Sequence, residues 1–160
     1  MSTHTISVFV ENRHGALSRI AGLFSSRGYN IESLTVAPTE DASVSRMTIV
    51  VAGDESVLEQ VNKQLNKLID VIKVADYIDT PLVERELLLV RLDAAKGMRH
   101  EIIGIAQAYG GAIASMTASS IIIELTAPSK TIDDFIAVVK SYGVKDLVRS
   151  GKVAMAEPQR

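Results

Sequence analysis

The stretch that decides the fold of the first half of the chain is residues 5–37, TISVFVENRHGALSRIAGLFSSRGYNIESLTVA. Residues 5–10 are rich in β-branched side chains and predict a strand, and a polar loop follows at 11–15. A helix is indicated next by apolar residues at the i, i+3, i+4 and i+7 spacing: Leu17, Ile20, Ala21 and Phe24. Gly28 suits the position just past the end of this helix, and residues 31–37 predict a second strand.

The alternation of strands and helices continues to residue 78 and then repeats. Residues 44–51 and 71–78 predict two further strands. The helix between them has Asp54 as its expected N-cap and an apolar stripe made of Leu58, Val61, Leu65 and Leu68. In the second half the pattern predicts strands at 83–92, 112–117, 121–126 and 152–155, helices at 98–109 and 131–139, and a turn at 144–149.

Each half therefore has the order β-α-β-β-α-β. The sequence predicts an α+β protein of two tandem ferredoxin-like domains, residues 1–78 and 83–160, with a linker at 79–82. Right-handed crossovers place both helices of a half on one face of its sheet. Residues 47–51 include apolar side chains at consecutive positions, and hence on both faces of a strand. We therefore expect an uncovered apolar face that binds a partner.

The composition of the 160 residues excludes several classes of protein. Apolar residues make up 47% and charged residues 22%, which excludes intrinsic disorder, and a net charge of −2 disfavours a nucleic-acid-binding protein. The absence of cysteine excludes disulfides and thiolate chemistry. No apolar run approaches the roughly 18 residues of a membrane span, and no signal-peptide pattern is evident, so we expect a cytoplasmic location.

Few residues suggest catalysis. The three histidines, His4, His14 and His100, do not share ligand spacing on one element, so no metal site is expected. No nucleotide-binding loop and no nucleophile motif occurs in the sequence. We therefore expect no catalytic residues in this chain.

One loop does suggest ligand binding, the segment 11–17 between the first strand and the first helix. The first N–H groups of a helix are unpaired and carry partial positive charge, so they can receive a carboxylate. The small residues Gly15 and Ala16 leave these groups accessible, and the Asn12 amide can meet an ammonium or a carboxylate. Asn30 stands at the start of the second strand. The alternative is a plain tight loop in which the glycine serves only the backbone.

The pattern Asn-x-x-Gly-Ala-Leu at 12–17, between a strand and a helix, resembles ACT domains, which are small regulatory modules that bind amino acids. A closer resemblance is to the regulatory small subunits of acetohydroxyacid synthase, also called acetolactate synthase. It is carried by residues 11–12, 15–20, 22–25, 27–39, 45–49, 63–71 and 83–87. The resemblance covers nearly the whole chain, and it is most specific at 27–39 and least specific at 97–126.

This resemblance implies a non-catalytic homodimer that activates a catalytic large subunit and confers feedback inhibition by a branched-chain amino acid, with valine expected. Thiamine diphosphate, Mg²⁺ and FAD would belong to that large subunit, and this chain would hold no cofactor. The effector would lie at the dimer interface between the strand–helix loop of one subunit and the second strand of its neighbour. The implied effector-binding residues are Asn12, His14, Gly15, Ala16 and Leu17 from the loop, with Asn30 and Ile31 from the strand.

Two other classes of protein use the same order of elements. An RNA-binding module would stack bases on sheet aromatics and needs a basic surface, whereas the expected third strand has no aromatic residue. A small hydrolase of the acylphosphatase type would use Arg13 in a phosphate loop together with Asn30.

In the second half, Asp93 follows the first strand where the first half has its loop, and its charge would repel a ligand carboxylate. We therefore expect no second amino-acid site.

Overall fold

The computed structural model describes residues 2–94 and 97–159, and it consists of two compact units. One unit comprises Met1–Val83 together with Lys152–Arg160, and the other comprises Glu84–Gly151. The expected second domain, 83–160, thus differs from the observed unit in where it ends. The end of the chain leaves the second unit and joins the first one.

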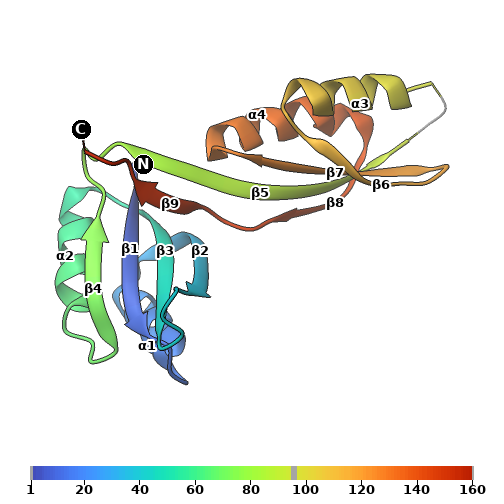
Figure 1. Cartoon of the computed structure of the whole chain (residues 1–160). Coiled ribbons are helices and arrows are strands. Elements are labelled where there is room, and N and C mark those ends of the chain that lie inside the picture. The colour runs from blue at the N-terminus through green and yellow to red at the C-terminus, as the bar shows by residue number, and fades with distance from the viewer. Residues whose placement is uncertain (1, 95–96, 160) are drawn as a thin grey trace. The chain divides into compact units, whose positions relative to one another are not determined.

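The first unit has the predicted order β-α-β-β-α-β (Figure 1). Its elements are β1 (Thr3–Glu11), α1 (Ala16–Arg27), β2 (Asn30–Pro38), β3 (Val44–Ala52), α2 (Glu55–Leu65) and β4 (Val71–Asp76). The strands form an antiparallel sheet in the order β2-β3-β1-β4, so that β2 and β4 are edge strands. The expected ferredoxin-like architecture of this half is confirmed.

The core of the first unit lies between the sheet and the two helices. Alternate residues of β1 and β3 point toward the helices because successive side chains of a strand face opposite ways. The buried apolar residues are Ile6, Val8, Val10, Met47, Ile49 and Val51 from these strands, with Ile20, Phe24, Leu58, Val61 and Leu65 from the helices. Asp54 caps α2 as expected, since its side chain accepts a hydrogen bond from Val57 N at 3.0 Å.

The other face of this sheet is neither fully uncovered nor mainly apolar, and the expectation stated above is wrong on this point. Ser7 and Thr48 are buried there, at 0% and 4% exposure. Residues near the end of the chain reach this face, where Arg46 Nη2 donates to Ala154 O at 3.0 Å. Because Val50 is flanked on its face by polar residues, the consecutive apolar positions of β3 do not make an apolar surface.

The second unit repeats the same architecture. Its elements are β5 (Leu82–Asp93), which begins in the first unit, α3 (Arg99–Ala108), β6 (Ala112–Met116), β7 (Ser120–Ala127), α4 (Ser129–Val139), the short 3-10 helix η1 (Lys140–Tyr142) and β8 (Val144–Arg149). The sheet order is β6-β7-β5-β8, and α3 and α4 lie on one side of it (Figure 1). A last strand, β9 (Val153–Ala156), pairs with β5 outside this path.

The sequence prediction placed the fourth strand of the second sheet at the wrong residues. Residues 144–149 were expected to be a turn, with the strand near 152–155, but β8 occupies the edge of the sheet beside β5. Val144 and Leu147 of β8 pack against the buried core of this unit. Their spacing is irregular because the β5–β8 pairing contains a bulge, and this obscures the two-residue period of a strand.

In the described part of the chain, no helix is both long and apolar enough to cross a membrane.

Candidate functional site

The loop between β1 and α1 is fastened to the turn between β2 and β3. Asn12 N donates to Ser43 O at 2.7 Å, and Asn12 Nδ2 donates to Ala42 O at 2.9 Å. These bonds fix the orientation of the Asn12 amide, so that its Oδ1 is the atom that can accept from a ligand. Asn12 therefore both holds the loop in place and offers an acceptor.

Gly15 is the N-cap residue of α1 and has a left-handed backbone conformation, with φ 84°. A Cβ at this position would lie 2.9 Å from Nη1 of Arg19, one turn further along the helix. Within the described residues no side chain caps α1, and its first turn contains no acidic residue. This helix start is suited to attract an anion through its backbone N–H groups, and anion binding there stays a prediction.

An ion pair next to this helix start was not found from the sequence. Arg19 Nε donates to Asp70 Oδ2, and the Asp70 residue is only 3% exposed. The hydrogen bond from Arg19 holds the pKa of the Asp70 carboxyl below its usual value. Asp70 O also accepts from Glu11 N at 2.9 Å. The pair thus links the first turn of α1 to the residues that precede β4, which are 51 positions away along the chain.

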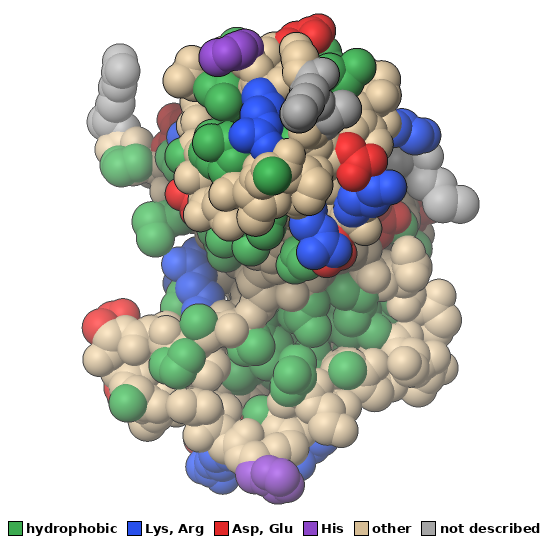
Figure 2. Space-filling view, turned by 90° about the vertical axis from the view of Figure 1, so that its right-hand side faces the viewer, with side chains coloured by type: hydrophobic (Ala, Val, Ile, Leu, Met, Phe, Trp, Pro, Cys, Tyr) green, Lys and Arg blue, Asp and Glu red, His purple; other side chains and the backbone are tan. Residues whose placement is uncertain are grey.

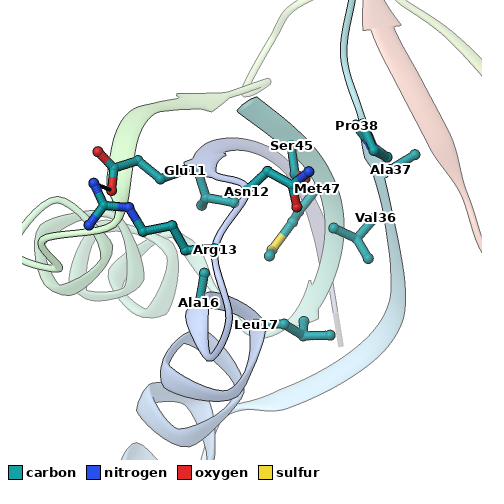
Figure 3. A pocket seen from close by; sticks show the side chains of 11 residues that line it. Glu11, Asn12, Arg13, Ala16, Leu17, Val36, Ala37, Pro38, Ser45 and Met47 are labelled. Carbon is teal, nitrogen blue, oxygen red and sulfur yellow. Dashed lines mark ion pairs between the residues drawn. The ribbon is translucent and has the colours of Figure 1, made fainter. Parts of the chain in front are cut away.

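A cavity of about 220 Å³ opens beside this helix start (Figure 3). It is formed by the end of β1, the loop, the first turn of α1, and the facing ends of β2 and β3. The lining residues are Val10, Glu11, Asn12, Arg13, Ala16, Leu17, Val36, Ala37, Pro38, Ser45 and Met47. Its volume is below the roughly 300–1,000 Å³ of sites for drug-sized ligands, and so it suits a small metabolite.

The cavity combines an apolar wall with one polar corner. The side chains of Leu17, Val36 and Met47 surround it, while Asn12 points into it from the loop (Figure 3). The Glu11 and Arg13 side chains form an ion pair at 2.6 Å on the side away from β2. The arrangement can hold a small molecule that has a carboxylate for the helix start and an aliphatic side chain for the wall.

The apolar wall is open to solvent along β2. Leu17 is 42% exposed and Val36 is 44% exposed. Figure 2 shows hydrophobic side chains gathered in a hollow of the first unit, on the side of the sheet where β2 lies. Exposed apolar side chains next to a cavity are typical of a surface that a ligand or a partner buries.

The structure brings together only part of the residues that the sequence singled out. Asn12, Ala16 and Leu17 line the cavity, and Gly15 stands at the helix start beside it. His14 is exposed and is not among the lining residues. Asn30 and Ile31 pair with Ala52 and Val51, whereas the cavity lies at the other end of β2, where Pro38 pairs with Ser45.

Sequence reasoning missed the cavity residues that come from β2 and β3. Val36, Ala37 and Pro38 reach the loop only because the β2–β3 register sets Val36 beside Met47 and Pro38 beside Ser45. The β1–β3 register sets Val10 beside Ser45, and this closes the corner. The hairpin was predicted, so a count outward from its turn could have found these residues.

No group of three or more His, Asp or Glu side chains that could hold a metal ion occurs among residues 2–94 and 97–159. In the second unit, Asp93 lies where β5 ends and pairs with Lys145 at 3.2 Å. The following residues, 95–96, lie outside the described part of the chain. The expectation of no second amino-acid site stays a prediction.

Comparison with known proteins gives one consistent result. Residues 6–73 match the family model described as an AHAS small subunit-like ACT domain, and residues 85–158 match the model of the small subunit of acetolactate synthase. A probable acetolactate synthase small subunit of Archaeoglobus fulgidus is 51% identical over 95% of both chains. The small subunit of acetolactate synthase isozyme 3 of Escherichia coli is 45% identical over 94% of this chain and 93% of its own.

The fold agrees with a solved structure of the same description. The crystal structure of an acetolactate synthase small subunit from Thermotoga maritima superposes with a TM-score of 0.93 and 33% sequence identity, and the match covers 100% of both chains.

Proposed function

The chain belongs to the acetolactate synthase small subunits, and from this membership we propose that it regulates a separate catalytic large subunit. In this proposal the chain raises the activity of the large subunit and makes it sensitive to feedback inhibition by a branched-chain amino acid, with valine as the effector. Thiamine diphosphate, Mg²⁺ and FAD belong to the large subunit. The absence of a cofactor from this chain and its cytoplasmic location stay predictions.

The observation that carries the effector assignment is the cavity at the start of α1. Because Ala16 N already donates to Arg13 O at 3.3 Å, a valine carboxylate would meet the next N–H groups of the first turn, those of Leu17 and Ser18. Its ammonium would meet Oδ1 of Asn12. The isopropyl group would lie against Val36, Leu17 and Met47. Burial of such a side chain contributes about 1.5–3 kcal/mol, which is enough to distinguish valine from glycine.

In a homodimer, the partner subunit would supply the two implied effector-binding residues that lie far from the cavity within one subunit, Asn30 and Ile31. The edge strand β2 offers unpaired backbone groups along residues 30–38. If two copies of β2 pair antiparallel about Leu34, the central residue, then the partner subunit's Asn30 comes opposite Pro38. The partner subunit's Asn30 and the partner subunit's Ile31 would then complete the wall. This pairing would place the effector where the family resemblance implies.

The two alternative functions receive no support from the site. A stacking surface for RNA needs open aromatic rings, but Phe9 lies under the Arg46 guanidinium at 5.2 Å from its ring centroid. A phosphate site of the acylphosphatase type needs Arg13 and Asn30 together. Arg13 is instead paired with Glu11, and Asn30 lies at the opposite end of β2.

Calorimetric titration of the purified chain tests the effector assignment. Valine should bind, while glycine, which lacks the isopropyl group, and isobutylamine, which lacks the carboxylate, should each bind at least about tenfold more weakly. A chain that releases no heat with valine, or that binds isobutylamine as well as valine, would contradict the assignment.

A further inference from the structure

The end of the chain lies across the sheet face of the first unit that the helices leave open. Lys152 N donates to Ser33 Oγ at 2.9 Å, and Thr35 Oγ1 donates to Lys152 O at 3.1 Å. The hydroxyls of Ser33 and Thr35, on alternate residues of β2, therefore bind the backbone N–H and the backbone C=O of Lys152. Residues 152–156, which include β9, are called the C-terminal strap below.

Arg46 of β3 forms a second attachment for the strap. Its Nη2 donates to Ala154 O and to Tyr77 Oη, each at 3.0 Å, and its Nε donates to the buried Ser7 Oγ at 2.9 Å. Ala154 is the buried residue of the strap at 7% exposure, whereas Val153 and Met155 on either side of it are more than half exposed. The alternation shows that one face of the strap packs on the sheet.

The strap binds the side of β2 that is opposite to the cavity. Ser33 and Thr35 alternate with Leu34, which packs against the core, and with Val36, which lines the cavity. Within one subunit β2 is an edge strand, held by backbone hydrogen bonds only through its pairing with β3, and in the dimer proposed above its other edge pairs with the partner's β2. The two hydroxyl contacts therefore add restraint to the strand that forms the apolar wall.

We propose that the C-terminal strap positions β2 and thereby sets the affinity of the cavity for its effector, with Ser33 and Thr35 as the positioning residues. The effector part of this inference rests on the function proposed above. This role of the strap explains why the sheet face on which an apolar surface was expected has polar side chains instead, those of Ser7, Ser33, Thr35 and Arg46. Ser33, Thr35 and Arg46 bind backbone groups of the strap, and Ser7 accepts a hydrogen bond from Arg46.

The test uses the full chain with the double substitution Ser33→Ala and Thr35→Val, which removes both hydroxyls and keeps strand-forming side chains. Loss of a neutral hydrogen bond corresponds to about a fivefold change in an equilibrium constant, so the Kd for valine should rise by about fivefold or more. Amide hydrogen exchange across residues 30–38 should become faster, even without valine.

Two matched variants separate positioning from general damage. The variant Ser33→Thr with Thr35→Ser keeps both hydroxyls and should retain the wild-type affinity and exchange. The substitution Thr126→Val removes a hydroxyl from an exposed strand position in the second unit and should also behave as wild type.

The same contact can be removed from the side of the strap. Lys152→Pro deletes the N–H that binds Ser33, whereas Lys152→Ala deletes only the long side chain and should have the smaller effect. Because Ser33→Ala and Lys152→Pro remove one shared bond, their effects on the valine Kd should not add.

Wild-type valine affinity in both the hydroxyl double variant and Lys152→Pro would overturn the proposal, whether or not amide exchange changes. If the wild-type chain itself binds no valine, the effector assignment fails. The rate of amide hydrogen exchange at residues 30–38 then decides by itself whether the strap holds β2. An unchanged rate in these variants would overturn the claim that the strap positions β2.

Discussion

The substitution Gly15→Asp places a carboxylate where the ligand carboxylate is proposed to bind. Two unit charges about 4 Å apart repel each other by about 1–4 kcal/mol between bulk water and a protein surface, which corresponds to a loss of valine affinity of roughly fivefold to a thousandfold. The new side chain also competes for the N–H groups at the start of α1. We therefore predict that this variant loses its response to valine.

The structure also gives the cost of this substitution in folding. At φ 84° a residue other than glycine is strained by about 1 kcal/mol, although aspartate and asparagine tolerate this region better than most residues. The 2.9 Å approach of an added Cβ is to Nη1 of Arg19, at the end of a long, half-exposed side chain whose Nε is held by Asp70, so the guanidinium has to shift within that ion pair. We expect the melting temperature to fall by about 4–8 °C or less, so the variant stays folded at room temperature.

Gly15→Asn is the matched control, since it has the same shape and backbone cost but no charge. Calorimetry with valine on both variants, together with their melting curves, separates strain from repulsion. Gly15→Asp should bind valine at least about fivefold more weakly than Gly15→Asn does. Equal affinity in the two variants would refute the argument from charge, and wild-type affinity in Gly15→Asp would remove the helix start from the site.

Three further predictions concern the dimer, the ion pair and the activity of the chain. Asn30→Ala should keep the dimer and the activation of the large subunit but resist valine, and loss of activation as well would show that Asn30 is structural. Arg19 lowers the pKa of Asp70, so the folded state favours the charged carboxylate. The resulting stabilisation of the folded chain is fully present above the pKa that Asp70 has in the unfolded chain. It is lost as the pH falls through the lower pKa that Asp70 has in the folded chain. The melting temperatures of wild type and Asp70→Asn should therefore differ at neutral pH and converge in acid, and a constant difference would exclude this pair as the cause. The chain purified without its large subunit should form no acetolactate in a coupled assay, and turnover by the pure chain would contradict the regulatory assignment.

Local sequence patterns predict the order of elements but not the long-range contacts of the site. The strand, loop and helix at 5–27 follow from the two periods of apolar residues, and the uncapped helix start follows from Gly15 and Ala16. The apolar wall depends on strand register, which sets Val36 beside Met47. The Arg19–Asp70 pair joins residues 51 positions apart, and neither residue has a local signal for the other.

The position of the last residues of the chain is the clearest case in which local patterns are insufficient. Residues 152–155 were correctly expected to be extended, but their partners Ser33, Thr35 and Arg46 are more than 100 positions away. The consecutive apolar positions within residues 47–51 instead predicted an apolar surface on this sheet face. Only the folded chain shows that these side chains bind backbone groups of the strap.

The most direct test of the central claim is the activity of a purified acetolactate synthase large subunit from the same source, assayed alone, with this chain, and with this chain and valine. We predict that the chain raises the rate of acetolactate formation and that valine lowers this rate only when the chain is present. An unchanged rate on addition of the folded chain, or equal inhibition by valine with and without it, would contradict the account.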